Sequence, residues 1–219
     1  MSLAPQLEAV GRIASSEERT AQYTRLLEQA LHDTPSASLP SLVRTYVDGA
    51  VLDPVNTTGA GLLVGRHMLA HLATQLAAAH IPANILCTIV SDTLASCEAS
   101  SIMGDDELGP WRVLLAEQYA SLSRWRDAAQ ALQSITPHAA RRIPQLSFAQ
   151  LCVRVVELWL HDLPSHVAEA EQADELDVVQ RWLARWAQQS GTTLPELFLV
   201  RVSAQEIALY LMGPAQLPA

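Results

Sequence analysis

Two histidines are the side chains in this sequence whose spacing could hold a metal ion. His67 and His71 are separated by one helical turn, so on a helix both imidazoles would lie on one face. A zinc site also needs a third ligand, and no glutamate follows His67 in the HExxH pattern of metalloproteases. We therefore interpret both residues as partly buried helix histidines and predict no metal site.

Other patterns of catalysis and cation binding are incomplete. Asp105, Asp106 and Glu107 form an acidic run that lacks the alternate spacing and the glycine of a calcium loop, which predicts a solvated acidic turn. Residues 59–61 (GAG) lack the third glycine and the preceding strand of a dinucleotide-binding motif, and no GxSxG or P-loop pattern is present. The sequence thus predicts no catalytic residue, no cofactor and no enzyme. A small metal-dependent hydrolase in a helical fold is kept as an alternative.

Tryptophan is the residue type here that most often carries binding energy at protein interfaces. Trp125 and Trp159 fall on apolar helix faces, which favours a place in the core. Trp182 and Trp186 lie one helical turn apart, and each follows an arginine. These two are the candidate interface residues.

The charge of the chain narrows the class of partner. The formal net charge is −9, and every one of the 14 basic residues is arginine. A phosphate backbone requires a basic surface, so we expect no nucleic acid partner. An acidic surface instead suits protein partners with basic patches.

The cysteines and the apolar segments indicate the compartment. Cys87, Cys97 and Cys152 are an odd number without CxxC spacing, which favours reduced thiols inside helices. The start of the chain lacks a signal-peptide pattern, and Arg66 and several histidines interrupt the longest apolar stretch. We expect no membrane association and a location in cytoplasm and nucleus.

The elements that would position these residues all have helical periodicity. A capping box at residues 15–18 (SSEE) begins the first confident helix, and apolar residues then recur at three- and four-residue spacing. With 49% hydrophobic but only 5% aromatic residues, small aliphatic side chains favour close helix packing. Helices are predicted around residues 15–31, 42–51, 62–76, 82–94, 111–122, 125–135, 148–160, 165–188 and 194–212, with a loop at 103–110.

Short links between helices of similar length predict antiparallel pairs that stack along the chain. The fold class expected is therefore all-α, a right-handed superhelical array of antiparallel helix pairs, TPR-like or HEAT-like. We predict a flexible N-terminal arm over residues 1–14, a helical repeat domain over 15–212 and a tail over 213–219.

One predicted pair has a tetratricopeptide-like pattern. Residues 111–119 (WRVLLAEQY) are followed by 123–132 (SRWRDAAQAL). We expect Tyr119 to fill the interface between the two helices, Ala128 and Ala129 to permit a close approach, and Trp125 to cover Tyr119 and Ala129 at the turn. Tyr119, Trp125, Ala128 and Ala129 are thus predicted to be structural residues of the repeat.

Several blocks in order resemble the family of the fourth subunit of the COP9 signalosome. Residues 22–31 (QYTRLLEQAL) resemble its opening helix "KYRxILEKA", and 64–69 (VGRHML) resemble "SRQLL". Residues 125–132 (WRDAAQAL) resemble "WRNAAQVL". Residues 158–162 (LWLHD) and 168–170 (AEA) fall where the family has "LYLED" and "AEA".

The resemblance covers about residues 18–172 and implies a function. It implies a non-catalytic scaffold subunit of a complex that deneddylates cullin–RING ubiquitin ligases, with other signalosome subunits and cullin–RING ligases as partners. That family continues into a C-terminal PCI domain, which we do not expect in this chain. A subunit of the proteasome lid or another TPR-like adaptor is the alternative.

Overall fold

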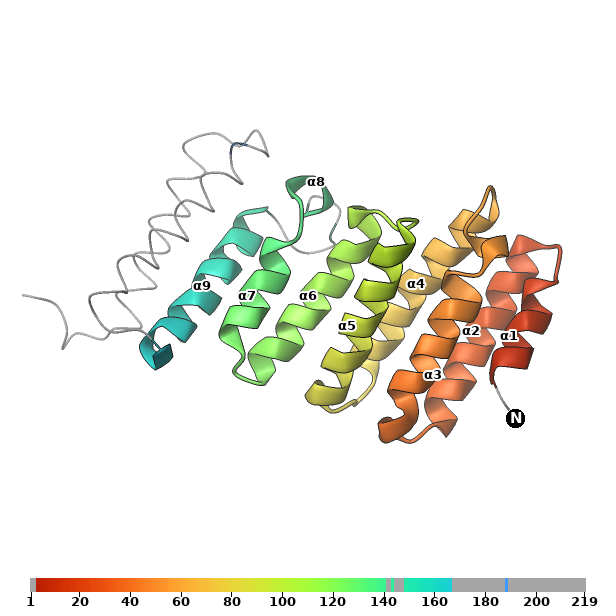
Figure 1. The fold of residues 1–219 in the computed structure, drawn as a ribbon, viewed down its shortest axis with the longest axis horizontal. Coiled ribbons are helices and arrows are strands. Elements are labelled where there is room, and N and C mark those ends of the chain that lie inside the picture. The colour runs from red at the N-terminus through yellow and green to blue at the C-terminus, as the bar shows by residue number, and fades with distance from the viewer. Residues whose placement is uncertain (1–2, 141–142, 144–147, 167–187, 189–219) are drawn as a thin grey trace, which may run out of the picture. The chain divides into compact units, whose positions relative to one another are not determined.

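The computed structural model describes residues 3–140, 143, 148–166 and 188, and every regular element within these ranges is a helix or helical turn (Figure 1). The predicted all-α class, with helices packed on helices, is confirmed for this part of the chain. Residues 1–118 and 119–219 form two compact units, each described by itself. The elements are α1 (Leu3–Gly11), α2 (Ser16–Asp33), η1 (Ser36–Ser38), α3 (Leu39–Tyr46), η2 (Val47–Val51), η3 (Pro54–Asn56), α4 (Gly61–Ala78), α5 (Ala83–Ser100), α6 (Asp105–Ser121), α7 (Trp125–Gln133), α8 (Pro137–Ala140) and α9 (Phe148–His166).

The first helix corrects the prediction of a flexible arm over residues 1–14. Leu7 and Val10 of α1 are buried, and α1 contacts α2, α3 and η2. Leu7 lies so close to Gly49 of η2 that a Cβ on that glycine would be 3.0 Å from Leu7 Cδ1. Sequence reasoning missed α1 because it is short and only two of its side chains enter the core.

The turn between α1 and α2 is held by polar side chains, as the capping box predicts. Ser15 Oγ accepts a hydrogen bond from the backbone N–H of Glu18 at 3.3 Å, which satisfies a free donor of the first turn. The buried guanidinium of Arg19 donates to the carbonyl of Ile13 at 2.7 Å and to Ser16 Oγ at 3.3 Å. These bonds fix the direction in which α2 leaves α1.

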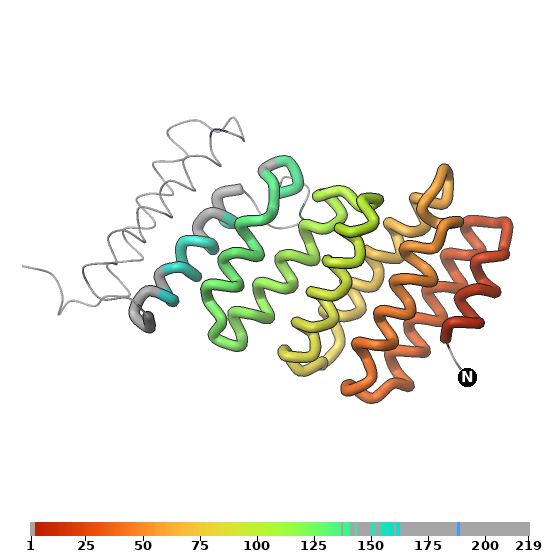
Figure 2. Tube along the Cα trace, in the orientation of Figure 1, coloured from red at the N-terminus to blue at the C-terminus, as the bar shows by residue number. Residues whose placement is uncertain are grey.

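In the N-terminal unit, consecutive long helices run in opposite directions (Figure 2). Helix α2 packs against α4, and helix α3 packs against α5. A polar contact crosses the core, because the hydroxyl of Tyr46 lies 3.3 Å from both the Tyr23 carbonyl and Met68 Sδ. The buried side chains around it include Tyr23, Leu27, Val43, Tyr46, Val47, Met68, Leu72, Leu76, Ile89 and Val90.

Two glycines one turn apart let α4 lie directly against the preceding backbone. A Cβ at Gly61 would be 1.8 Å from the Val55 carbonyl oxygen. A Cβ at Gly65 would be 2.7 Å from the carbonyl oxygen of Asn56 and 2.8 Å from that of Val51. Any larger residue would therefore push α4 away from η2 and η3.

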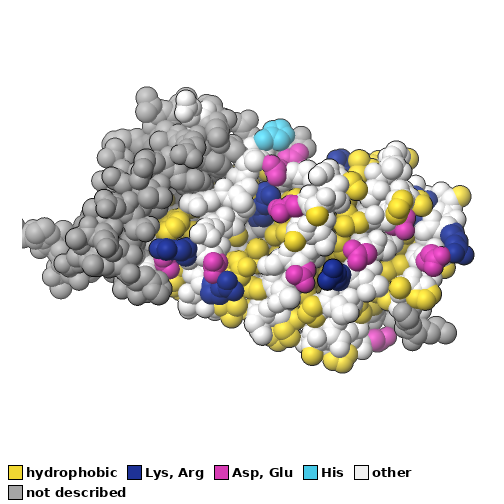
Figure 3. Space-filling view, viewed as in Figure 1, with side chains coloured by type: hydrophobic (Ala, Val, Ile, Leu, Met, Phe, Trp, Pro, Cys, Tyr) yellow, Lys and Arg dark blue, Asp and Glu magenta, His cyan; other side chains and the backbone are white. Residues whose placement is uncertain are grey.

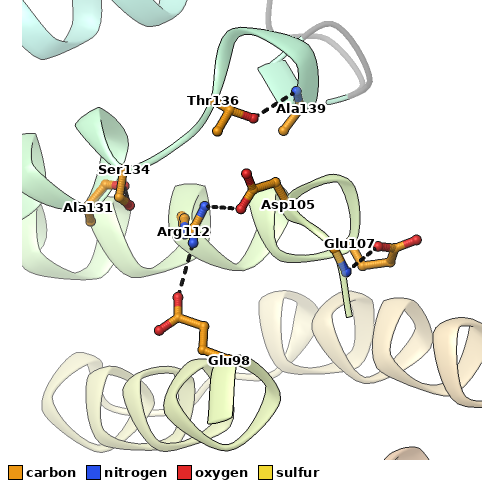
Figure 4. A network of polar contacts seen from close by, with 9 residues as sticks. Glu98, Asp105, Glu107, Arg112, Ala131, Ser134, Thr136 and Ala139 are labelled. Atoms are coloured by element: carbon orange, nitrogen blue, oxygen red, sulfur yellow. Dashed lines mark hydrogen bonds and ion pairs between the residues drawn. The ribbon is translucent and has the colours of Figure 1, made fainter. Parts of the chain in front are cut away.

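The start of α6 differs from the predicted loop at residues 103–110. Asp105, Asp106 and Glu107 are the first turn of α6, where carboxylates interact favourably with the helix dipole. Arg112 donates to Asp105 at 3.2 Å and to Glu98 of α5 at 3.0 Å, while Glu107 accepts from the Gly104 N–H at 2.9 Å (Figure 4). The acidic run therefore begins a helix, and Arg112, which Asp105 helps to hold, ties that helix to α5.

In the C-terminal unit, α7 packs against α9 and the short α8 also contacts α9. The chain enters α7 through Ser123, whose φ of 58° lies in the left-handed region. Ala128 and Ala129 are fully buried on α7, and Leu151, Val155 and Leu158 are buried on α9. Small side chains on α7 thus meet branched aliphatic ones on α9.

Candidate functional site

Aromatic and arginine side chains gather where α7 begins and α9 nears its end. We call this group the aromatic–arginine cluster. All its members belong to the C-terminal unit. They are Tyr119, Arg124, Trp125, Arg126, Trp159, His161 and Asp162.

The first contact of the cluster places Arg124 over Tyr119. The guanidinium carbon of Arg124 is 4.4 Å from the centre of the Tyr119 ring, a distance typical of a cation–π interaction. Arg124 Nε also donates to Asp127 Oδ2 at 2.7 Å. The tyrosine ring is therefore covered by an arginine that is itself held by a carboxylate.

The second contact joins the two helices. The indole of Trp125 stacks on the imidazole of His161, with ring centroids 4.9 Å apart and planes inclined by 28°. Trp125 is half-buried and His161 is exposed. The stack therefore lies at the surface, where it orients both rings.

The third contact is an ion pair with a carboxylate that is almost fully buried. Arg126 Nε lies 3.0 Å from Asp162 Oδ2, and the Asp162 side chain is only 8% exposed whereas that of Arg126 is 45% exposed. The same guanidinium lies 5.3 Å from the Trp159 ring centre. Arg126 thus satisfies a buried carboxylate and covers an aromatic ring at once.

This arrangement supports binding of a protein more directly than it supports a reaction. Tryptophan, tyrosine and arginine dominate the energetics of protein interfaces, and here their side chains are already oriented by one another. On the face drawn in Figure 3, arginine side chains of the described residues lie beside carboxylates, so the surface is one of mixed charge.

The structure places Trp125 in a contact other than the predicted one. We expected the indole to cover Tyr119, but Arg124 covers that ring and Trp125 instead contacts His161. Ala128 and Ala129 have no exposed surface, and their helix α7 packs against α9. Trp182 and Trp186 lie outside the described residues.

Sequence reasoning did not single out the two arginines of the cluster as site residues, nor His161 and Asp162. Both fall in the block 158–162 (LWLHD) that carries part of the resemblance, and Arg126 falls in the block 125–132. The signal in the sequence was that an arginine and an aspartate, Arg126 and Asp162, occur in two separate blocks of the resemblance. No spacing within one helix reveals it, because the contact is between helices.

The histidines considered as metal ligands lie on α4 in the other unit. His71 Nε2 is 3.7 Å from Glu28 Oε1 of α2, and His67 lies one turn earlier at the surface. Across the described ranges, no three His, Cys, Asp or Glu side chains converge as a metal site would require. Within the same ranges, no helix has the length and apolar character needed to cross a bilayer.

The described thiols are not placed to act as nucleophiles. Cys87 and Cys97 are both buried thiols. Burial, together with the neighbouring Glu98 carboxylate, raises the pKa of the Cys97 thiol to about 11. At neutral pH this thiol is protonated and unreactive.

Comparison with known proteins confirms the resemblance seen in the sequence blocks. No protein-family model matches the chain. The chain is 29% identical over 170 residues to COP9 signalosome complex subunit 4 of Caenorhabditis elegans. The alignment covers 73% of this chain but only 40% of that relative. The chain is thus similar to part of a signalosome subunit and spans less than half of its length.

Proposed function

We propose that this protein is a non-catalytic scaffold of a COP9 signalosome-type complex. The observation that carries the proposal is the similarity to a signalosome subunit over 73% of the chain. A chain that consists of packed helices over its described residues suits such a role, because helical arrays present long surfaces to other proteins.

The proposal extends to the partners of the protein and to its cellular location. Other signalosome subunits are the direct partners, and cullin–RING ligases are the substrates whose deneddylation the complex performs. The protein acts in cytoplasm and nucleus. Tyr119, Trp125, Ala128 and Ala129 maintain the helix packing, and the aromatic–arginine cluster is a surface available for assembly.

Copurification tests this function. The full chain is tagged in its own cells, and bound proteins are identified by mass spectrometry. Recovery of signalosome subunits and cullins is expected. Recovery of proteasome-lid subunits alone would transfer the chain to the alternative complex.

A matched pair of variants shows whether the partners need the folded helices. Ala129→Asp places a charge at a position with no exposed surface and should abolish recovery. Gln130→Asp changes the adjacent exposed residue on the same helix and should leave recovery unchanged. Equal recovery by both variants would indicate that capture does not depend on this fold.

The hydrolase alternative has its own test. Metal content is measured in the purified full chain after mild chelation. We expect no stoichiometric zinc in the wild type. Zinc that is retained by the wild type and lost in His67→Ala would support a metal enzyme instead.

A further inference from the structure

One buried cation in the N-terminal unit has no carboxylate to balance its charge. Arg19, in the first turn of α2, is only 5% exposed. Within the described part of the chain it forms no ion pair, and its guanidinium donates to neutral oxygens. Buried charges are ordinarily paired, because removing an ion from water is costly. Arg19 is therefore a residue to which an added anion would supply the missing opposite charge.

The guanidinium is fully used at one end and incompletely used at the other. Nη1 donates to the carbonyl oxygens of Ile13 at 2.7 Å and Ala14 at 3.4 Å. Nη2 lies 3.3 Å from Ser16 Oγ, and Nε is buried without a hydrogen-bond partner among the described residues. The Nε–H and one N–H of Nη2 form a fork that fits two oxygens of a phosphate. This fork adjoins Ser16.

The position of Ser16 suits a phosphate group. Ser16 is the first residue of α2, so an anion attached to it lies at the positive end of the helix dipole. The residue is half-buried and lines an open groove of about 640 Å³, whose other wall is the start of α4. That volume is far larger than a phosphate, so the group has room beside Arg19.

Carboxylates near this position oppose an anion less strongly than Arg19 attracts it. Glu17 and Glu18 are exposed, so solvent and salt screen their repulsion. Arg12 and Glu8 form an exposed pair that adds no net charge. Arg19 is buried, and a buried charge is screened much less. The nearest unscreened charge is therefore the positive one.

We infer that Ser16 is a phosphorylation site whose phosphate is held by Arg19 and the N-terminus of α2. A protein kinase transfers the group from ATP: the serine oxygen bonds to the γ-phosphorus, the bond from that phosphorus to ADP breaks, and the serine proton passes to the catalytic base of the kinase. The phosphate accepts from Nε and Nη2, while Nη1 keeps its bonds to the turn.

The modification strengthens the connection between α1 and α2, because Arg19 then joins the phosphate to the carbonyls of Ile13 and Ala14. It also adds negative charge at the edge of the groove that Ser16 lines. Phosphorylation of Ser16 goes beyond the proposed scaffold function and does not depend on it.

Mass spectrometry of the tagged chain from its own cells tests whether the modification occurs. The protein is purified with phosphatase inhibitors and cut with trypsin, which cleaves after Arg12 and Arg19 and releases residues 13–19 (IASSEER). Fragment ions distinguish a phosphate on Ser16 from one on Ser15. We expect it on Ser16. A peptide recovered only without phosphate, or with phosphate on Ser15 alone, would overturn the inference.

Purified full chains with phosphoserine incorporated at one position test the role of the helix and of Arg19. Phosphoserine at position 16 should raise the equilibrium constant for folding by about tenfold in urea denaturation. Phosphoserine at position 38 is the matched control, since Ser38 directly precedes α3 and makes no cap hydrogen bond. Its gain should be about threefold, as expected of a helix dipole alone.

Arg19→Gln should remove the advantage of position 16 over position 38. Each phosphorylated chain is compared with its own unphosphorylated form, so any stability lost through the substitution itself cancels. Arg19→Lys, which keeps the charge but not the fork, should retain part of the advantage and replaces Arg19→Gln if that variant does not fold.

Phosphorus NMR gives a second measurement that a purely structural role of Arg19 would not affect. In the wild type, the second pKa of the phosphate should be lower at position 16 than at position 38, because the guanidinium favours the dianion. In Arg19→Gln the two pKa values should be equal. Equal values in the wild type, or a chain that phosphoserine at position 16 destabilises, would contradict the proposed contact with Arg19.

Discussion

The indole of Trp125 in α7 lies on the imidazole of His161 in α9, with 4.9 Å between ring centroids. The stack connects the first residue of one helix with a residue near the end of its neighbour. Since α7 packs on α9, the two rings cover one end of that contact. Trp125 is thereby a residue of the helix interface that also reaches the surface.

Trp125→Ala should lower the free energy of unfolding by about 2 kcal/mol, less than the 3–5 kcal/mol typical of a fully buried tryptophan. His161→Ala should cost about 1 kcal/mol, and the double variant should cost less than the sum because the stack is lost only once. Urea denaturation measures all three. A stable Trp125→Ala protein that no longer binds partners would make Trp125 a contact residue instead.

Arg126→Ala should destabilise the C-terminal unit because it leaves the nearly buried Asp162 carboxylate without this guanidinium. Solvent screens the exposed arginine, so the expected loss is about 1 kcal/mol. Arg154→Ala is the matched control, since it removes an arginine paired at 3.1 Å with Glu157 on the surface of α9. Its effect should stay below about 0.5 kcal/mol in thermal melts, and equal losses in both variants would contradict a special role for Asp162.

Gly65→Ala should destabilise the N-terminal unit by about 1–3 kcal/mol, although the same change usually stabilises a helix interior. The reason is that the added Cβ would lie under 3 Å from the carbonyl oxygens of Asn56 and Val51. Chemical denaturation with hydrogen exchange over η2 and η3 measures the effect. A gain in stability would mean that α4 does not approach this backbone as closely as described.

The free energy of unfolding should decrease as the pH rises through the alkaline range, and Cys97 should account for part of this decrease. Its folded pKa of about 11 is above the ordinary value of 9.0, so the thiol loses its proton more easily in the unfolded chain. The unfolded state therefore binds fewer protons between these values, and stability falls as pH rises from about 9 to about 11. Below pH 9 the thiol is protonated in both the folded and the unfolded state, so it does not make stability depend on pH.

Cys97→Ala identifies this contribution in urea denaturation across the same pH range. The variant should be less stable than the wild type at pH 7, because the substitution leaves a small cavity. Its free energy of unfolding should, however, decrease less than that of the wild type between pH 9 and pH 11. Burial also raises the pKa of Tyr23 and Tyr46, so a decline should persist above pH 10. An identical slope with and without the thiol would exclude Cys97 as a source.

The sequence by itself determined the helical class, and its local blocks carried the resemblance to a signalosome subunit. Apolar periodicity and the Ser15 cap are local signals, and the structure confirms helices over the described segments, including the hydrogen bond from Glu18 to Ser15. The blocks of the resemblance were also local, and they agree with the 29% identity to a signalosome subunit. Local patterns suffice here because helix hydrogen bonds join residues close in sequence.

Tertiary structure decided which residues meet. Only the packing of α7 on α9 brings Trp125 to His161 and Arg126 to Asp162, residues 36 positions apart in each pair. Only the core decides that α1 is a packed helix and that residues 105–107 begin α6, because each gains its stability from neighbouring elements.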